Sequence, residues 1–517
     1  MKNILEENSN LAAVICIGPD LIKMRVCGLK KGKINNVDVL ESPINLGHEI
    51  FNNKKISFEC IKNISNILNG YLTVLKEYDI NNYKVIASTF FLEAENSEYV
   101  IDQLKIHNDI VLEVLEDSQE KSLVYYNVLN TLLKNKNDKK YVLIAYISSS
   151  SVGVALYDGK DIVFSQNVRI GSLKLYDLLC SIKDETNDFH IVLEEYLKRI
   201  IGRINIPIDK SNIDTLILVG SQISLLKRFC KKDSSKESEI EKDKFYSFYE
   251  EIKDLSSKTI SEKYDILLND AELLFVSFSI YRKIFDFVYD AKILVFNADI
   301  SDTVLLNSMI FKSKINYSNH IKSSSIACSK TVSEHYYCDK AHRDETLSFS
   351  ELIFDKMKKI HGLDDKKRLL LENAIILHEI GYYVSPKNPR KSTFDIIKNL
   401  DVYGLKKEEV NIIAIIAKYD ELSVPNVYDK EYEKLSKKNK LLVSKLIAIF
   451  RIANALANAK KQKINSLNIK IFNDEIIFTG ETDENVYLEK WAFNKCAPFF
   501  EEVFGIKPQL IIKTLLF

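Results

Sequence analysis

The chain has 517 residues, of which 46% are hydrophobic and 28% are charged, and Lys plus Arg balance Asp plus Glu at 72 each. This length is too great for one hydrophobic core and predicts three or four domains. The balanced charge excludes an overall basic field that would attract nucleic acid or an anionic membrane. The composition also excludes disorder over most of the length.

The eight cysteines show no CxxC spacing, and several of them lie in apolar runs. This pattern favours reduced thiols over a disulfide framework or a zinc site. The N-terminal stretch MKNILEENSN is polar and acidic, without the apolar core of a signal peptide. No apolar run reaches the ~18 to 20 residues of a membrane span. We therefore expect a cytoplasmic protein without a membrane partner.

Two stretches share the pattern of a strand, a turn of small residues and a second strand. Residues 12–33 read AAVICIGPDLIKMRVCGLKKGK, and residues 141–160 read YVLIAYISSSSVGVALYDGK. Each predicts a β-hairpin, and the repeat predicts two similar α/β lobes that face each other across a cleft. The alternative is that such hairpins recur in many unrelated sheets. The four serines of the second hairpin are placed where a phosphate could be held.

Beta-alpha alternation continues through both of these regions and predicts open sheets with helices packed on them. In the first lobe we expect helices and strands at residues 58–78, 84–88, 91–104, 109–115 and 118–129. In the second lobe we expect a strand at 161–168, helical structure over 175–204, and strands at 215–220 and 292–297. The charge-mixed segment 231–244, KKDSSKESEIEKDK, predicts a solvated loop insert.

Long helical periodicity begins near residue 336 and continues to about 463. Helices are expected over residues 349–361, 367–380, 394–400, 407–419 and 441–459. The last segment, 464–517, alternates as short strands around one helix and predicts a small α+β cap.

Twelve ordered segments of the chain resemble the Ppx/GppA phosphatase family, the exopolyphosphatases and guanosine pentaphosphate phosphohydrolases. In the lobes they are ICIGPDLIKMRV, SPINLGHEI, IASTFFLEAEN, LEVLEDSQEKSLVYYNV, LIAYISSSSVGVAL and NVRIGSLKL. In the helical half they are HRDETLSFSELIFDKM, LLENAIILHEIG, RKSTFDIIKN, AIIAKYDE, FRIANAL and LEKWAFNKCAPFFEEVFG. The resemblance implies two actin-like ATPase (ribonuclease H-like) lobes, an all-α HD-type domain and a small α+β cap. The predicted domains are 1–128, 129–307, 320–463 and 464–517.

By the same resemblance, Glu120 matches the glutamate of S-G-x-E-E-A-R that serves as catalytic base, and Mg²⁺ is the implied cofactor. The other motif positions differ, with Cys16 and Tyr146 for aspartates, Gly153 for a glutamate, and Asn45 and Leu92 for arginines. A neutral thiol and a phenol are poor ligands for Mg²⁺. We therefore expect weak or lost hydrolysis of polyphosphate or pppGpp. The alternative for Glu120 is a solvated carboxylate at a helix start.

An anion could still be held by a small set of groups in the two hairpins. Serine hydroxyls donate to phosphate, and an arginine near the following turn adds charge, although a Cβ where the family has glycine obstructs close approach of the backbone. The candidate phosphate-binding residues are Gly18, Ser148, Ser149, Ser150, Ser151 and Arg169.

The HD-type resemblance also implies a metal site, of which four candidate ligands remain: His342, His378, Glu379 and Asp420. Two imidazoles and two carboxylates could bind one metal. Alternatively, His378 and Glu379 merely end a helix before a glycine. Because Lys391 and Asn454 stand at further ligand positions, we predict no tightly bound divalent metal.

Three functions stay open on this basis. The chain is a weak or altered phosphohydrolase that uses Glu120, a non-catalytic binder of polyphosphate or a guanosine polyphosphate nucleotide, or a scaffold whose lobes keep only the fold. We also expect a homodimer and no nucleic-acid partner.

Overall fold

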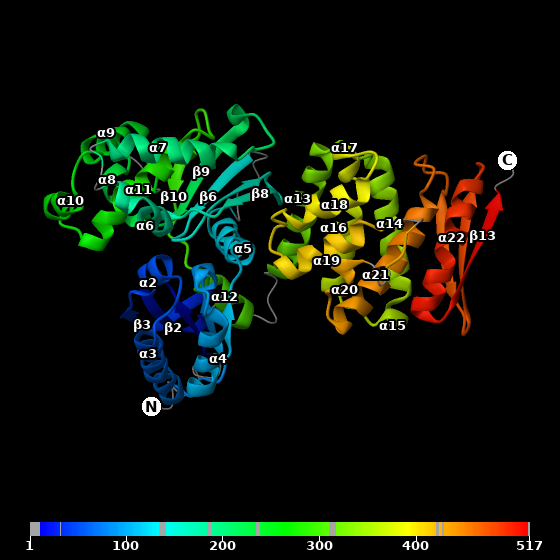
Figure 1. The fold of residues 1–517 in the computed structure, drawn as a ribbon, viewed down its shortest axis with the longest axis horizontal. Coiled ribbons are helices and arrows are strands. Elements are labelled where there is room, and N and C mark those ends of the chain that lie inside the picture. The colour runs from blue at the N-terminus through cyan, green and yellow to red at the C-terminus, as the bar shows by residue number, and fades with distance from the viewer. Residues whose placement is uncertain are drawn as a thin grey trace. The chain divides into compact units, whose positions relative to one another are not determined.

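The computed structural model describes residues 11–30, 33–133, 141–183, 186, 188–233, 238–309, 317–419, 423–425 and 429–514. The chain divides into two compact units, Met1–Ile321 and Lys322–Phe517. The first contains two five-stranded sheets, and the second contains a group of helices with a three-stranded sheet (Figure 1).

The sheet of the first lobe has its first strand at the centre. Its order is β3-β2-β1-β4-β5. Strand β1 (Ala12–Ile17) pairs antiparallel with β2 (Leu21–Lys30), which pairs antiparallel with β3 (Lys33–Pro43). On its other side β1 pairs parallel with β4 (Tyr83–Ala87), which pairs parallel with β5 (Leu112–Val114).

The second lobe repeats this arrangement. Its order is β10-β9-β6-β7-β8. Strand β6 (Tyr141–Ile147) pairs antiparallel with β7 (Val152–Tyr157), and β7 with β8 (Ile162–Val168). Strand β6 also pairs parallel with β9 (Ile213–Gly220), and β9 with β10 (Lys292–Val295). The predicted pair of similar α/β lobes is confirmed.

Helices connect the strands and pack on the two sheets (Figure 1). In the first lobe they are α2 (Leu46–Asn53), α3 (Phe58–Glu77), the 3₁₀ helix η2 (Thr89–Glu93), α4 (Ser97–Asn108), α5 (Asp117–Val128) and the π-helical turn η3 (Leu129–Leu133). In the second lobe they are α6 (Ser172–Lys183), α7 (Phe189–Ile200), η4 (Ile201–Arg203), η5 (Lys210–Asn212), α8 (Ile223–Cys230), α9 (Lys242–Ile252), α10 (Ser257–Tyr264) and α11 (Leu268–Phe285).

Strand β1 is apolar along its whole length because both of its faces are covered. Ile15 and Ile17 pack into the core beneath α3 and α4. Ala12 and Val14 point the other way and pack with Leu305 of α12 (Ile300–Met309). Helix α12 follows the last strand of the second lobe in sequence, yet it covers the sheet of the first. The sequence does not predict that α12 returns to the first lobe, because only tertiary packing brings the helix to that face of the sheet.

The segment 231–244 is only in part the solvated loop that its charges predict, since Lys231, Lys232 and Asp233 are exposed. Residues 234–237 lie outside the described residues, but Ile240 is buried in the second lobe and its N–H donates to the carbonyl of Ile293 at 2.9 Å. Helix α9 begins at Lys242. A single isoleucine in a polar segment is enough to pair with the edge strand β10 and to bury itself there.

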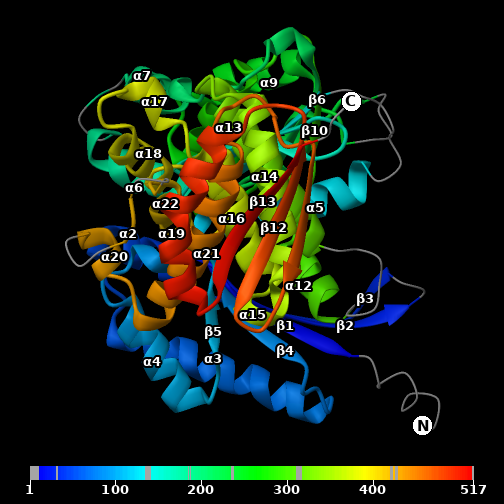
Figure 2. The ribbon, with the colours of Figure 1, turned by 90° about the vertical axis from the view of Figure 1, so that its right-hand side faces the viewer.

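The second unit is mostly helical and ends in a small sheet. Its helices are α13 (Tyr317–His335), which begins in the first unit, α14 (Lys340–Lys356), α15 (Lys358–His361), α16 (Asp365–Leu377), α17 (Gly381–Val384), α18 (Pro389–Lys398), α19 (Lys407–Ala417), α20 (Lys430–Glu433) and α21 (Lys437–Leu456). The strands β11 (Ser466–Ile471), β12 (Glu475–Thr482) and β13 (Lys507–Thr514) follow, with α22 (Tyr487–Phe504) packed against them (Figure 2).

One hydrophobic core runs through this second unit. It contains Ile449 of α21 together with Phe478 of β12 and Phe493 of α22. The α+β segment predicted as a cap is therefore packed as part of the same core as the helices. Within the ranges given above, no helix has the length and apolar character needed to cross a membrane.

Candidate functional site

Glu120 lies in the first turn of α5, at the face of the first lobe that meets the second lobe. Its Oε2 accepts a hydrogen bond from the backbone N–H of Thr89 at 2.7 Å. Its Oε1 accepts one from the phenol of Tyr146, on β6 of the second lobe, at 2.8 Å. Only 2% of Glu120 is exposed. The solvated carboxylate considered above is therefore wrong, because Glu120 is a buried bridge between the lobes.

Burial sets the electrostatics of this bridge. It raises the pKa of the Glu120 carboxyl, and the hydrogen bonds from Thr89 and Tyr146 only partly offset that effect. A raised carboxyl pKa is a feature of general bases. Here, however, each oxygen already accepts a hydrogen bond from a protein donor, and the exposed surface is too small for a nucleophilic water.

Lys121, which the sequence analysis overlooked, is buried beside Glu120. Its side chain is 1% exposed, and Nζ lies 2.5 Å from Oδ2 of Asp117 and 2.9 Å from Oγ of Ser151. The Ser151 hydroxyl donates in turn to Oδ1 of Asp117 at 2.6 Å. Because a buried ammonium is stable only when it is paired, this triad is a structural element of the cleft. Asp117 and Lys121 are four residues apart on a helix, and this spacing could have predicted their ion pair from the sequence.

Gly153 on β7 makes room for the Lys121 side chain. A Cβ at this position would lie 2.5 Å from Cδ and Cε of Lys121 and 2.6 Å from the phenol oxygen of Tyr125. These distances are shorter than any normal contact. A glutamate could not occupy position 153 unless Lys121 moved, so the glycine and the buried lysine depend on each other.

The predicted phosphate-binding serines form a turn that is largely satisfied by its own chain. The N–H of Ser148 donates to the carbonyl of Ser151 at 2.9 Å, and the hydroxyl of Ser148 accepts from the N–H of Ser151 at 3.1 Å. Ser150 and Ser151 are buried. The N–H of Lys174 donates to the carbonyl of Ser149 at 3.0 Å, which packs the start of α6 onto the turn.

The other two candidates for phosphate binding lie in turns. The N–H of Gly18 donates to the carbonyl of Leu21 at 2.9 Å, closing the turn between β1 and β2. Arg169 is exposed, just after β8. Gly171 lies against the serine turn, since a Cβ there would be 2.2 Å from the carbonyl oxygen of Ser148. The first of these contacts occupies the N–H of Gly18, which a phosphate would need.

Cations at the lobe interface are paired with carboxylates. Lys174 of α6 lies 2.9 Å from Glu93 of the first lobe. Arg25 of β2 lies 2.7 Å from Asp302 and 3.1 Å from Asp299, at the start of α12. These pairs connect segments that are far apart in sequence. They also neutralise positive charge that would otherwise attract a phosphate.

The residues at the metal positions of the two hairpins do not fit Mg²⁺. Burial raises the pKa of the Cys16 thiol above its usual range, so the sulfur stays protonated. The Tyr146 phenol is also neutral, since burial and the Glu120 carboxylate raise its pKa. Mg²⁺ requires anionic or strongly polar oxygen ligands in octahedral geometry. Cys16 and Tyr146 therefore do not fit the magnesium-ligand positions that the resemblance implies.

A histidine makes a further contact between the lobes. Nδ1 of His48, on α2, lies 3.3 Å from Oδ1 of Asp177, on α6. The hydrogen bond to Asp177 raises the pKa of His48 above its ordinary 6.5 despite partial burial, and Asp20 and Glu272 act in the same direction.

His48 should therefore contribute to stability at low pH. Because its pKa is higher in the folded than in the unfolded state, this contribution is complete below the unfolded value and is lost as pH rises through the folded value. Between about pH 6 and 8 the native chain should lose more stability than a His48→Gln variant, which keeps a hydrogen-bonding group without the charge. Thermal unfolding of both proteins across this range measures the difference. The same substitution at the exposed His107 serves as the control. Equal slopes of stability against pH in the native chain and in His48→Gln would refute the expectation.

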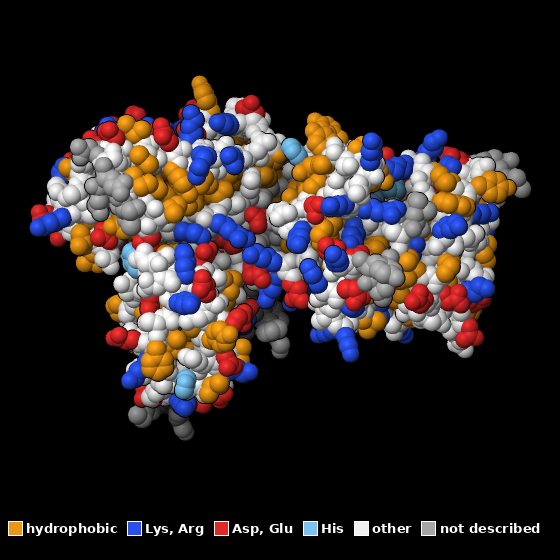
Figure 3. All heavy atoms as spheres, in the orientation of Figure 1, with side chains coloured by type: hydrophobic (Ala, Val, Ile, Leu, Met, Phe, Trp, Pro, Cys, Tyr) orange, Lys and Arg blue, Asp and Glu red, His pale blue; other side chains and the backbone are white. Residues whose placement is uncertain are grey.

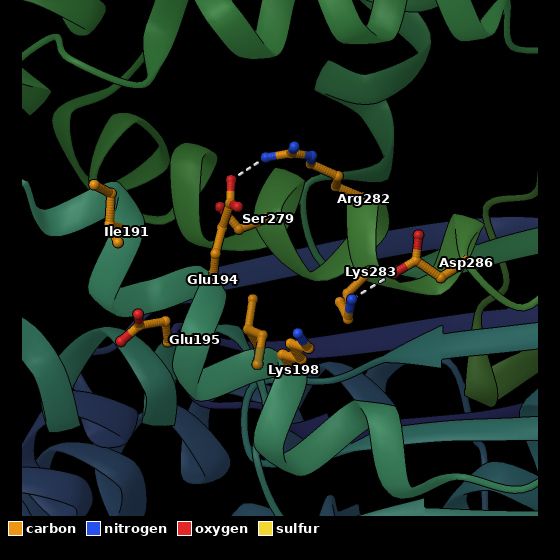
Figure 4. A pocket seen from close by; sticks show the side chains of 9 residues that line it. Ile191, Glu194, Glu195, Lys198, Ser279, Arg282, Lys283 and Asp286 are labelled. Carbon is orange, nitrogen blue, oxygen red and sulfur yellow. Dashed lines mark hydrogen bonds and ion pairs between the residues drawn. The ribbon is translucent and has the colours of Figure 1, made fainter.

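A separate hollow of about 260 Å³ lies on the second lobe, between α7 and α11. Its charged side chains face one another: Glu194 bonds Arg282, and Lys283 bonds Asp286 (Figure 4). On the molecular face in Figure 3, acidic and basic side chains are interspersed in the same way. This hollow offers paired charges rather than an unbalanced set that would select a ligand.

In the second unit, two histidines and a glutamate converge as the sequence predicts. Potential ligand atoms of His342, His378 and Glu379 all lie within 4.8 Å of one another. Nε2 of His342 is 3.8 Å and Nε2 of His378 is 4.0 Å from Oε1 of Glu379. Burial, with some help from His378, lowers the pKa of His342 to about 4, so this imidazole is neutral near pH 7.

The other positions considered for this metal site lie in different surroundings. Asp420 lies outside the described residues. Lys391 is exposed and lines a pocket with Lys418. Asn454 is buried on α21. The ammonium of Lys460, which sequence reasoning missed, bonds Oε1 of Glu379, and no motif spacing connects residues 81 positions apart.

Comparison with known proteins finds one family model that matches part of the chain. Residues 326–495 match the family model described as Ppx/GppA phosphatase, domain III. Over these residues the chain is similar to the Ppx/GppA family. A comparison with curated proteins gives no match.

Solved structures of Ppx/GppA proteins resemble this chain. An exopolyphosphatase from Cytophaga hutchinsonii aligns with a TM-score of 0.50 and 14% identity, over 58% of this chain and 97% of that one. The Ppx/GppA family member from Aquifex aeolicus aligns with a TM-score of 0.48 and 16% identity, over 58% of this chain and 97% of that one. At this identity the Cytophaga structure supports the fold, in agreement with the repeated sheet order.

These findings confirm the predicted resemblance to the Ppx/GppA family and the α/β fold class with two similar lobes. The HD-type assignment of the helical unit, the domain boundaries, a homodimer, a cytoplasmic location and the roles of individual residues stay predictions. The candidate residues of the lobes and those of the second unit nevertheless differ in what they contact. The lobes join Glu120 to Tyr146 instead of to solvent, and the second unit joins its histidines to Glu379 and Lys460.

Proposed function

We propose that this chain is a Ppx/GppA protein without phosphohydrolase activity, in which the former catalytic cleft joins the two lobes of a scaffold. The observation that carries the proposal is the position of Glu120. The only motif residue that could act as the base is 2% exposed, and its two oxygens accept hydrogen bonds from Thr89 and Tyr146. A group bound in this way supports the structure but does not activate water.

The surrounding charges support the same conclusion. Phosphoanhydride hydrolysis needs a metal or cations to neutralise the phosphate oxygens in the transition state. One such contact is typically worth ~3 to 4 kcal/mol, so loss of the metal ligands and of the motif arginines at Asn45 and Leu92 would together reduce turnover by many orders of magnitude. Lys121 does not replace them, because its ammonium is already paired with Asp117.

Binding of polyphosphate without hydrolysis is the less supported alternative. It would need cations and unoccupied donors at the two hairpins. The cations described at the lobe interface, Lys121, Lys174 and Arg25, all have carboxylate partners. Ser150 and Ser151 are buried. Apart from the exposed Arg169, the cations near the hairpins would have to leave existing ion pairs before they could bind an anion.

Phosphate release tests the proposal directly. The purified full-length chain is incubated with polyphosphate and with pppGpp in the presence of Mg²⁺ or Mn²⁺, beside an active exopolyphosphatase as positive control. We expect release at background, and no change in Glu120→Gln. Calorimetric titration with polyphosphate separates the scaffold from a non-catalytic binder. Turnover of about 1 s⁻¹ or more that disappears in Glu120→Gln would show that the cleft is an active site.

A further inference from the structure

The two histidines of the second unit are arranged so that both present Nε2 to Glu379. Nδ1 of His342 lies 3.1 Å from the carbonyl oxygen of Ala457, and Nδ1 of His378 lies 2.6 Å from that of Ile375. A carbonyl can only accept, so each Nδ1 carries a proton, and the nitrogen through which each ring could bind a metal is Nε2. This is the arrangement found for metal-ligating imidazoles, in which the second nitrogen is fixed by an outer hydrogen bond.

A cation is nevertheless already present at this cluster. The Lys460 ammonium bonds Oε1 of Glu379, the same oxygen that lies 3.8 and 4.0 Å from the two Nε2 atoms. Lys460 follows the end of α21 with a φ of +55°. This left-handed conformation is unfavourable for a lysine and is usually adopted by glycine or asparagine. The backbone thus accepts strain at the residue whose side chain reaches Glu379.

Asn454 completes the surroundings of the cluster. On α21 the ring of Phe450 contacts that of His378 at 5.2 Å between centroids, and the Ala457 carbonyl accepts from His342. Asn454 lies between these two residues on the same helical face, since they are four positions before it and three after it. Its Oδ1 is buried and has no hydrogen-bond partner among the described residues. An additional oxygen donor is therefore located on the helical face that borders the histidines.

We infer that the Lys460 ammonium takes the place of a divalent cation in this cluster, and that His342, His378 and Glu379 form a latent transition-metal site once the ammonium is removed. Two imidazoles and one carboxylate are a common set of protein ligands for zinc, with a further position left for water. The ammonium and a divalent ion exclude each other, because two like charges in a poorly hydrated site repel strongly. Lys460 is 46% exposed, so its removal leaves a path for a metal to enter.

Cobalt binding tests this inference, because Co²⁺ occupies zinc sites and its visible absorption reports nitrogen ligands. The full-length chain is prepared without a polyhistidine tag, as native protein and as Lys460→Met, which keeps the apolar stem and removes the charge. Lys460→Arg preserves a cation, and Lys461→Met controls for loss of a neighbouring exposed lysine. We expect one Co²⁺ per chain in Lys460→Met, bound about 100-fold more tightly than in the other three proteins, toward the upper end of ordinary coupling between two ligands.

Thermal unfolding gives a second measurement. Lys460→Met should unfold at a lower temperature than the native chain in the absence of metal, and Co²⁺ should restore the difference. Adding His378→Ala to Lys460→Met should abolish both cobalt binding and the recovery. If Lys460→Met does not fold, Lys460→Gln is titrated in its place. Stoichiometric metal in the native protein that is lost in His342→Ala, or Co²⁺ binding in the folded variant that is no tighter than in the native chain, would overturn the inference.

Discussion

Replacing Asp117 by alanine should destabilise the first unit by about 3 kcal/mol, at the lower end of the range for breaking a buried ion pair. The variant leaves the Lys121 ammonium buried, with the Ser151 hydroxyl as its remaining hydrogen-bond partner among the contacts described above. Asp117 is itself 26% exposed, which limits the effect. Hydrogen exchange of amides in β6, β7 and α5 during chemical denaturation measures it.

Two comparisons make this test specific. Lys121→Met fills the same space without a charge, and it leaves a carboxylate that still reaches water, so it should cost less than Asp117→Ala. The chain contains one tryptophan, Trp491, which lies in the second unit. Its fluorescence should report the same stability in all three proteins. A smaller loss in Asp117→Ala than in Lys121→Met would mean that Lys121 is not held by Asp117.

Replacing Tyr146 by aspartate should cost even more, about 4 kcal/mol near pH 7. The substitution removes a ring between the lobes, removes the donor to Oε1 of Glu120, and adds a second carboxylate to the cleft. The loss should shrink as pH falls, because the two carboxyls become protonated and no longer repel each other. Chemical denaturation at about pH 5 and 7 measures both the size and the sign of the effect.

Tyr146→Phe is the matched control. It keeps the ring and removes only the hydroxyl, so it should cost about 1 to 2 kcal/mol, the usual loss when a buried acceptor loses its partner. If Tyr146→Asp were as stable as Tyr146→Phe, the space beside Glu120 would already accept a second carboxylate. The cleft would then be closer to a hydrolase centre than the bridge between Glu120 and Tyr146 implies.

Both variants test whether the residues between the two lobes serve structure, as we propose. Tyr146 donates to Glu120, and Gly153 leaves the space that Lys121 occupies. At these two positions the residue that departs from the family motif takes part in a contact between the lobes. Such mutual dependence is expected when residues of a site are selected for packing and hydrogen bonding instead of turnover.

Several features could be predicted from the sequence because they depend on local patterns. The apolar run of β6, the serine turn and the strand β7 form the predicted hairpin, and β1 and β2 repeat it. Helix α3 begins at Phe58, as its periodicity indicates. Hydrophobic periodicity and turn residues act over a few neighbours, so they predict elements and their repetition. The motif order also indicated the family and the position of Glu120.

Tertiary structure alone decided how these elements are used. The N–H of Ile240 donates to the carbonyl of Ile293 on β10, α12 covers the first lobe, and Lys460 reaches a glutamate 81 positions away. No periodicity encodes such contacts, because they depend on which faces need cover and which charges need a partner after the chain has folded. Glu120 illustrates the difference. The sequence by itself determined that a motif glutamate is present, whereas burial beneath Tyr146 and beside the Lys121 pair decided that it bridges two lobes.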